Sequence, residues 1–350
     1  MISIPPEGST MKPSETRRFG RTDFSVTAFA FGTAPLGNFL QEVSEEDAGQ
    51  MIQHAWDAGI RLYDTSPMYG HGLAELRLGQ ALRWKNRDDF VISTKVGRTL
   101  HAAPRADIDF APWVNATPNR MTFDYTYDGT MRSFEDSLQR LALERIDMVF
   151  IHDIDRFTHG QNQPEVFKQA MGGAWRALEK LRTEGVVRAI GVGVNEWEVC
   201  HAALQQHDFD CFLLAGRYTL LEQDALRDFL PLCEQRNVTL LVGGGFNSGI
   251  LATGAVKGAK YNYAPAPSHI LDRVSRIEAV CARHHVPLPA AALQFVVAHP
   301  AISSFCAGTR TTNQLTQNLA WFSHHIPEEF WNDLKAERLL AEDAPVPVAA

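Results

Sequence analysis

The sequence lacks the features that mark membrane, secreted and nucleic-acid-binding proteins. No apolar stretch approaches the roughly 20 residues needed to cross a bilayer, and the stretch 29–36 is broken by Gly32, Thr33 and Pro35. No run of Lys or Arg is present and the formal net charge is −8, so we expect no nucleic-acid partner, because such surfaces need clustered cations. Residues 1–15 have no cationic start followed by an apolar run, so we expect a loose tail rather than a signal peptide.

Cysteine is also scarce, with five residues that are widely spaced and form no C-x-x-C pair. An odd, scattered set indicates neither a disulfide framework nor a zinc ribbon. We therefore expect a protein of the reducing cytoplasm, away from membranes. Its oligomeric state stays open between a monomer and a small homo-oligomer.

The chain does contain a regular alternation of short apolar runs and amphipathic helical segments. Most of the runs lack polar alternation, as parallel strands buried on both faces do. The expected strands are 27–31, 60–63, 90–93, 148–151, 189–192, 211–214, 239–242 and 302–305. Eight such units without a linker predict an α/β fold, a single-domain (β/α)8 TIM barrel over residues 16–340, because a doubly wound sheet usually stops nearer six strands. Residues 1–15 and 341–350 are predicted to be tails.

Two connections in this scheme are unusually long, residues 97–128 after the third strand and 243–269 after the seventh. The active site of such a barrel lies on the loops that follow the strands. Long loops in a compact barrel are often lids or binding walls, so both are expected to border the site.

Four polar side chains follow the ends of consecutive strands: Asp64 and Tyr69 after the second, Lys95 after the third and His152 after the fourth. A phenol with a pKa of about 10 is a poor base at neutral pH, but a neighbouring ammonium lowers that pKa. Asp64 would hold the lysine, and His152 would donate a hydrogen bond to the substrate oxygen. A proton relay without a nucleophile suits hydride transfer from a bound cofactor.

At this point the sequence resembles the aldo-keto reductases. The matching stretches are RRFGRTDFSVTAFAFGT, YDTSPMYGHG, FVISTKVG, RIDMVFIHDID, EGVVRAIGVGVNE and AGTRTTNQLTQN, which span about residues 16 to 322. The resemblance implies the same four catalytic residues. It also implies a nicotinamide cofactor lying extended across the mouth of the barrel.

Carried over position by position, the resemblance implies that Asn195 holds the nicotinamide, the loop after the seventh strand holds the pyrophosphate, and the segment after the eighth holds the adenosine. The implied cofactor-binding residues are Gly32, Thr33, Asp64, Asn195, Gly243, Phe246, Gly249, Leu251, Gly308, Thr309, Arg310, Gln314, Gln317 and Asn318. Gly243 stands where many members have a stacking tyrosine, and Ala215 where many have a glutamine. Gln314 replaces an arginine that would hold a 2′-phosphate, so the sequence favours NAD over NADP.

The segment IHDID, together with DTSPMYG and the long third loop, resembles the branch that oxidises free aldoses at C1. That branch includes L-fucose, D-threo-aldose and L-galactose dehydrogenases, with pyridoxal 4-dehydrogenase a close relative. We expect oxidation of a C1 hemiacetal, of the L-fucose, L-galactose or D-arabinose type, to its lactone. Trp113, Tyr125 and Asp153 are the candidate substrate-binding residues. A pyridoxal 4-dehydrogenase or a general aldehyde or ketone reductase is the alternative.

Two other classes remain open. His152, Asp153 and Asp155, with two His-His pairs, would be the ligands of a metal-dependent barrel hydrolase. Their spacing is a weak signal, so no metal is expected. A cofactor-sensing regulatory subunit would keep the fold without turnover, but retention of all four catalytic residues argues against it.

Overall fold

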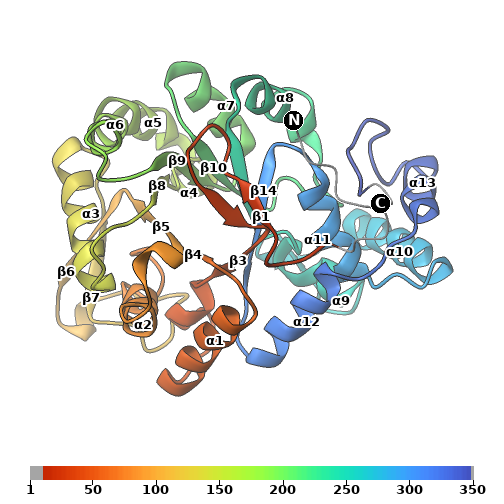
Figure 1. Cartoon of the computed structure of the whole chain (residues 1–350), viewed down its shortest axis with the longest axis horizontal. Helices are drawn as coiled ribbons and strands as arrows, with labels where there is room; N and C mark the ends of the chain where they lie inside the picture. The colour runs from red at the N-terminus through yellow and green to blue at the C-terminus, as the bar shows by residue number, and fades with distance from the viewer. Residues whose placement is uncertain (1–10, 348–350) are drawn as a thin grey trace.

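Eight parallel strands close on themselves in the order β3-β4-β5-β8-β9-β10-β11-β14 within residues 11–347, the part of the chain that this computed structural model describes. The strands form the centre of Figure 1 and the helices surround them. Their bounds are β3 Phe29–Gly32, β4 Leu62–Asp64, β5 Val91–Val96, β8 Met148–His152, β9 Ala189–Val194, β10 Cys211–Ala215, β11 Thr239–Gly243 and β14 Ile302–Gly308. The predicted (β/α)8 barrel is confirmed.

Each apolar run predicted as a strand contributes one barrel strand, and most extend further at their C-terminal ends than predicted. The first run is divided differently. Thr27 belongs to β2 (Ser25–Thr27), which pairs antiparallel with β1 (Thr16–Arg18) outside the barrel sheet. Phe19 and Phe24 of this hairpin stack at 5.1 Å and pack with the side chains that fill the barrel interior, so the hairpin closes one end of the barrel.

Helices cover the outside of the barrel. They are α1 Glu45–Asp57, α2 Leu73–Leu82, α3 Tyr127–Leu141, α4 Arg156–His159, α5 Gln163–Gln169, α6 Trp175–Thr183, α7 Trp197–Gln206, α8 Phe229–Arg236, α9 Ile250–Thr253, α10 Ser268–Arg283, α11 Leu288–Ala298, α12 Thr312–Phe322 and α13 Glu328–Ala336. Within residues 11–347, none of the helices is long and apolar enough for a membrane crossing.

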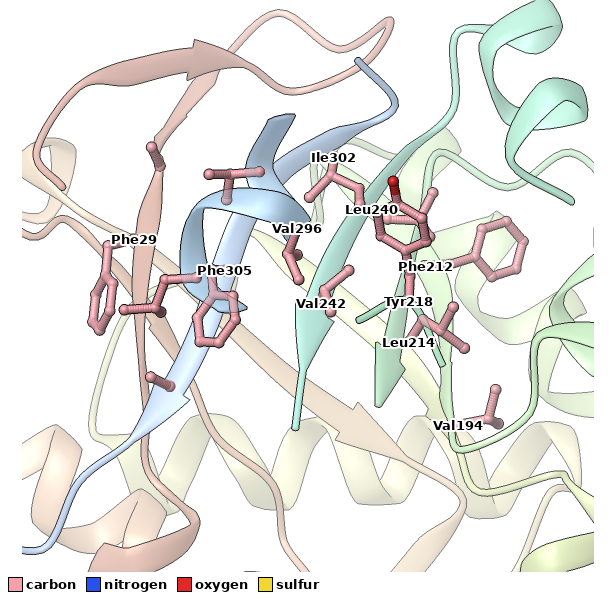
Figure 2. Close-up of a cluster of buried hydrophobic side chains, with 14 of the residues drawn as sticks. Phe29, Val194, Phe212, Leu214, Tyr218, Leu240, Val242, Val296, Ile302 and Phe305 are labelled. Atoms are coloured by element: carbon pink, nitrogen blue, oxygen red, sulfur yellow. The ribbon is translucent and has the colours of Figure 1, made fainter. Parts of the chain in front are cut away.

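The core has two layers, because successive residues of a strand point to opposite faces. Outward residues such as Phe29, Phe212, Val242 and Phe305 pack against the helix layer, as Figure 2 shows. Inward residues such as Leu62, Met148, Phe150 and Leu213 form a separate cluster that fills the barrel. This alternation decides which strand-end residues face the mouth.

The long connection after β5 is a folded wall. It contains the antiparallel pair β6 (Arg98–Ala102) and β7 (Asn119–Phe123) and then returns to the first loop. There the Leu40 amide donates to the Pro112 carbonyl at 2.9 Å, and the Val114 amide donates to the Asn38 carbonyl at 2.9 Å. The connection after β11 contains α9, β12 (Lys260–Tyr261) and β13 (Ala264–Pro265), and α10 begins at Ser268.

Parts of both predicted tails are attached to the barrel. The Pro13 carbonyl accepts a hydrogen bond from the Phe29 amide at 3.0 Å, and the Glu15 carbonyl accepts one from the Ala28 amide at 2.8 Å. Ala344 is buried in the core. Residues 1–10 and 348–350 of the predicted tails lie outside the described residues, and the domain limits of 16 and 340 stay predictions.

Candidate active site

A buried ion pair lies at the C-terminal ends of β4 and β5. Lys95 Nζ donates to Asp64 Oδ2 at 2.8 Å and to the Thr65 carbonyl at 2.9 Å, and Ser93 Oγ donates to Asp64 Oδ1 at 2.7 Å. Lys95 is 1% exposed and Asp64 is 3% exposed. Both side chains point inward because they alternate with Tyr63 and Val96, which pack outside the barrel. The strand-end placement predicted from the sequence therefore brings these two charges into direct contact.

Tyr69 lies above this pair, in the loop that follows β4. Lys95 Nζ is 4.7 Å from the centre of the Tyr69 ring, and the His152 ring stands edge-on to it at 6.3 Å. The next residue must be glycine: Gly70 has a φ of +64°, and a Cβ there would lie 2.5 Å from the Gly37 carbonyl oxygen. This contact fixes the loop that carries the phenol. The structure thus brings all four predicted catalytic residues together.

Burial and charge act in opposite directions on Tyr69. Lys95 lowers the pKa of the phenol, as the sequence predicted, but burial raises it by more, so the pKa lies above its ordinary value. Burial also opposes the charge of Lys95, but Asp64 and Tyr69 together raise the pKa of the ammonium above its ordinary value. The sequence showed the neighbouring cation but not how far the site is removed from water.

His152 is a neutral imidazole at neutral pH. Burial, with the charges of Arg98 and Lys95, holds its pKa well below the ordinary value. Its Nδ1 lies 3.2 Å from Ser66 Oγ, which leaves Nε2 for the mouth. The Tyr125 hydroxyl lies 2.8 Å from the His152 carbonyl and 2.9 Å from the Asp153 carbonyl. Tyr125, a predicted substrate contact, is fully buried and instead supports the backbone behind the histidine.

The other strands present small residues to the same level of the barrel. Gly32, Gly193, Ala215 and Gly243 occupy the inward positions at the ends of β3, β9, β10 and β11. Gly193 and Gly243 have no positive φ, and a Cβ at either would meet its nearest neighbour at 3.5 Å, an ordinary contact. Backbone strain therefore does not require glycine at these two positions. They keep the mouth open beside Lys95 and His152, on the side where the sequence places the nicotinamide ring.

The residues proposed to hold the adenosine end of the cofactor lie between the end of β14 and the middle of α12. The Thr309 hydroxyl is buried without a hydrogen-bond partner, which is unusual unless a ligand satisfies it. The Arg310 amide donates to Gln314 Oε1 at 2.9 Å, and its guanidinium donates to the Phe39 carbonyl at 3.0 Å. Gln317 is exposed and Asn318 is buried on the same helix. An unsatisfied hydroxyl beside a helix N-terminus fits a nucleotide phosphate or ribose.

Three of the predicted cofactor residues have other duties in the structure. Thr33 Oγ1 donates to the Asp64 carbonyl at 2.9 Å, so it ties β3 to β4. The Leu251 side chain is completely buried, which leaves only its backbone for a ligand. Phe246 packs edge-on against Phe305 at 5.6 Å.

The remaining predicted cofactor residues lie at the ends of elements. Asn195 is partly exposed just after β9, with its Oδ1 3.5 Å from the Tyr263 hydroxyl. Gly249, with a φ of +101°, precedes α9, and Gly308 ends β14.

Among the predicted substrate residues, Trp113 lies in the site and Asp153 beside it. The Trp113 ring is 5.8 Å from that of Tyr69, and its indole nitrogen is buried without a partner. Asp153, predicted to bind the substrate, is buried in an ion pair with Arg98 at 2.7 Å. Arg98 was missed, since nothing in its spacing shows that the chain turns its side chain inward.

The mouth of the barrel holds a phenol, an ammonium and a neutral imidazole beside an open glycine floor, formed by Gly32, Gly193 and Gly243. This combination in a (β/α)8 barrel defines an oxidoreductase. Residues 28–338 match the model of the Aldo/keto reductase family, and the chain belongs to that family. Aldo-keto reductases use NAD(P)H. Among residues 11–347, no group of three His, Cys, Asp or Glu side chains is arranged to hold a metal ion.

Two relatives indicate which branch of the aldo-keto reductase family this chain resembles. The chain is 46% identical over 342 residues to pyridoxal 4-dehydrogenase of Microbacterium luteolum, covering 95% of this chain and 99% of the relative. It is 39% identical to D-threo-aldose 1-dehydrogenase of a Pseudomonas species, covering 90% and 95%. The solved aldo-keto reductase of Bacillus halodurans, in its holo form, superimposes with a TM-score of 0.70 at 22% identity, covering 95% and 98%, which supports the fold. The predicted family and branch are confirmed.

Proposed function

We propose that this enzyme oxidises the C1 hemiacetal of an aldose to the lactone, with NAD(P)+ as the hydride acceptor and NAD favoured. The observation that carries the proposal is the buried Lys95–Asp64 pair, at 2.8 Å, lying directly against the Tyr69 ring. It provides a proton carrier at the barrel mouth, while the glycine floor leaves room for a nicotinamide ring.

The residues divide the work of moving one proton. Tyr69 takes the proton of the C1 hydroxyl, and the positive charge of Lys95 stabilises the phenolate that must exist before this transfer. Asp64 keeps Lys95 charged and fixed in position. Neutral His152 donates a hydrogen bond to the same oxygen and orients it, and Trp113 forms the wall beside it. The cofactor, when bound, supplies the hydride-accepting carbon.

Pyridoxal is the second candidate substrate, favoured by the 46% identity to pyridoxal 4-dehydrogenase. Aldoses and pyridoxal share one chemical feature: each holds an aldehyde within reach of its own hydroxyl group and closes to a cyclic hemiacetal. One site chemistry therefore serves both, and the wall around Trp113 would distinguish a flat aromatic ring from a sugar.

The deciding experiment is an absorbance screen at the reduced-nicotinamide band, with NAD+ and NADP+ each tested against L-fucose, L-galactose, D-arabinose and pyridoxal. Steady turnover, with lactone as the product, supports hemiacetal oxidation and removes the regulatory-subunit alternative. Tyr69→Phe is the control and should abolish turnover while cofactor binding, followed by fluorescence, persists. No turnover of any of the four, with simple aldehydes reduced instead, would make the protein a general reductase.

A further inference from the structure

Two buried arginine–aspartate pairs join β5 to β8, one at each end of these neighbouring strands. At the N-terminal end, Arg87 precedes β5 and Asp147 precedes β8, and they pair at 2.5 Å. At the C-terminal end, Arg98 follows β5 and Asp153 follows β8, and they pair at 2.7 Å. The two pairs offer a direct comparison of the closed end of the barrel with the mouth.

The pair at the closed end is fully satisfied by the protein. Arg87 donates to the Arg145 carbonyl at 2.9 Å and to the Phe90 carbonyl at 2.8 Å, in addition to Asp147. Asp147 Oδ2 also accepts from the Ile92 amide at 2.8 Å. Such saturation is expected of a structural ion pair.

The pair at the mouth leaves a donor unused. Arg98 Nη2 donates to Asp153 Oδ2, but Nη1 has no partner although the Arg98 side chain is only 7% exposed. The guanidinium carbon lies 4.5 Å from the centre of the Phe123 ring, a contact that helps to hold the side chain in place. Leaving a buried charged donor unpaired costs free energy, so a feature of this kind in a stable fold needs an explanation.

Asp153 is held beside the catalytic histidine by its backbone conformation. Its φ is +51°, in the left-handed region that Asp adopts more readily than most non-glycine residues, and the Tyr125 hydroxyl bonded to its carbonyl supports it there. Asp153 Oδ2 lies 3.5 Å from His152 Nε2, the nitrogen that the proposed function assigns to the reacting oxygen. Burial raises the pKa of the Asp153 carboxyl, which Arg98 opposes.

We propose that Arg98 and Asp153 together form a substrate-hydroxyl site, in which Arg98 Nη1 donates to, and the Asp153 carboxylate accepts from, one hydroxyl group close to the reacting carbon. A hydroxyl is the group that can do both at once. An anionic group fits worse, because Asp153 already neutralises the guanidinium and would repel it. This inference rests on the catalytic site of the proposed function and specifies which carbonyl or hemiacetal compounds that site selects.

The site gives the enzyme a preference for substrates that carry a hydroxyl next to the reacting carbon, or one carbon further away. The C2 hydroxyl of an aldose and the ring hydroxyl of pyridoxal both meet this condition. A site built to bind a hydroxyl discriminates strongly against an analogue that lacks it, because its polar groups then stay unpaired.

The test uses reduction of two small aldehydes, glyceraldehyde, which has the hydroxyl, and propanal, which lacks it. The wild-type enzyme should prefer glyceraldehyde in kcat/KM by roughly 10- to 100-fold, the range expected for a hydrogen bond to a charged group. Arg98→Lys keeps the cation but loses the second donor, and Asp153→Asn keeps the shape but loses the charge. Both variants should lose most of that preference, because kcat/KM for glyceraldehyde should fall further than kcat/KM for propanal.

Arg87→Met is the matched control, since it removes the same kind of pair at the closed end. It should lower stability towards urea and keep the preference for glyceraldehyde. A wild-type enzyme without the preference, or Arg98→Lys and Asp153→Asn variants that slow both aldehydes equally, would overturn the proposal. Because the assay measures reduction of open-chain aldehydes, it gives an answer even if none of the four hemiacetals is oxidised.

Discussion

Replacing Asp64 with Asn should separate stability from catalysis at the active site. The substitution keeps the shape of the side chain and one oxygen that can accept from Lys95, but it removes the negative charge that compensates the ammonium, and Lys95 is 1% exposed. Removing one partner of a buried ion pair costs about 3–5 kcal/mol, because the other charge stays buried without compensation. That is a large part of the roughly 5–15 kcal/mol by which a native protein is stable.

The double variant Asp64→Asn, Lys95→Met tests the cause of this loss. Methionine has a similar length and no charge, so no unpaired ion remains in the barrel, and we expect most of the lost stability to return. Catalysis should not return, because the Tyr69 phenolate has lost the ammonium 4.7 Å from its ring. Both variants should turn over about 100- to 10,000-fold more slowly than the wild type, the usual contribution of a positioned proton carrier.

Urea unfolding followed by tryptophan fluorescence gives the stability, and absorbance of reduced nicotinamide gives the turnover. The wild type, the double variant and the two single variants Asp64→Asn and Lys95→Met form a double-mutant cycle, whose coupling term should exceed about 2 kcal/mol. If Asp64→Asn costs less than about 1 kcal/mol, or if the double variant is less stable than the single one, the ammonium is not held as an uncompensated charge and the argument fails.

Four further results are expected. Oxidation should speed up with pH from 7 to about 10 without levelling off, since burial raises the pKa of Tyr69 and the base form is the phenolate; a plateau below pH 8 in kcat would contradict this. Burial lowers the pKa of His299 from 6.5 to about 4, so the unfolded chain binds more protons than the folded one between these pH values. The free energy of unfolding should therefore fall by up to about 3 kcal/mol as the pH drops through that window. His299→Gln should make this fall smaller in urea titrations. Gln314→Arg should raise kcat/KM for NADP+ relative to NAD+ by about tenfold through a second cation near Arg310, and an unchanged ratio would remove the basis for favouring NAD. Gly193→Ala should weaken cofactor binding in a fluorescence titration and leave the unfolding midpoint nearly unchanged, because a Cβ there meets its nearest neighbour at 3.5 Å, an ordinary contact.

The sequence predicted the barrel and the catalytic residues well because both depend on local patterns. Apolar runs marked each strand, and a strand's last inward residue is set by an alternation of period two. Asp64, Lys95 and His152 therefore fell on one mouth once the strands were known to be parallel. The errors of one to three residues at the C-terminal strand ends did not matter, because these catalytic residues follow the predicted runs within two residues.

What the sequence could not predict depends on contacts between distant segments. The pKa of Tyr69 was expected to fall because Lys95 was visible, but the depth of burial depends on the loop around Trp113, which packs over the phenol from far along the chain. Thr33 was expected to lie near the cofactor, and the sequence did not show that its hydroxyl donates to the Asp64 carbonyl. Burial and competition for one hydrogen bond are settled only by the three-dimensional arrangement.

The division of the mouth into a polar side and an open side explains how one ring of residues can hold charge and still admit a ligand. Asp64, Lys95 and His152 lie on three adjacent strands. Asp64 and Lys95 therefore pair directly, and neither side chain has to cross the barrel. The remaining strands end in small residues such as Gly193 and Gly243, and no side chain there can shield the buried charges or fill the space. If charged and small residues alternated around the mouth, the ion pair would be separated and side chains would fill the space left for a ligand. The order of the strands therefore determines the chemistry as much as the identity of the residues does.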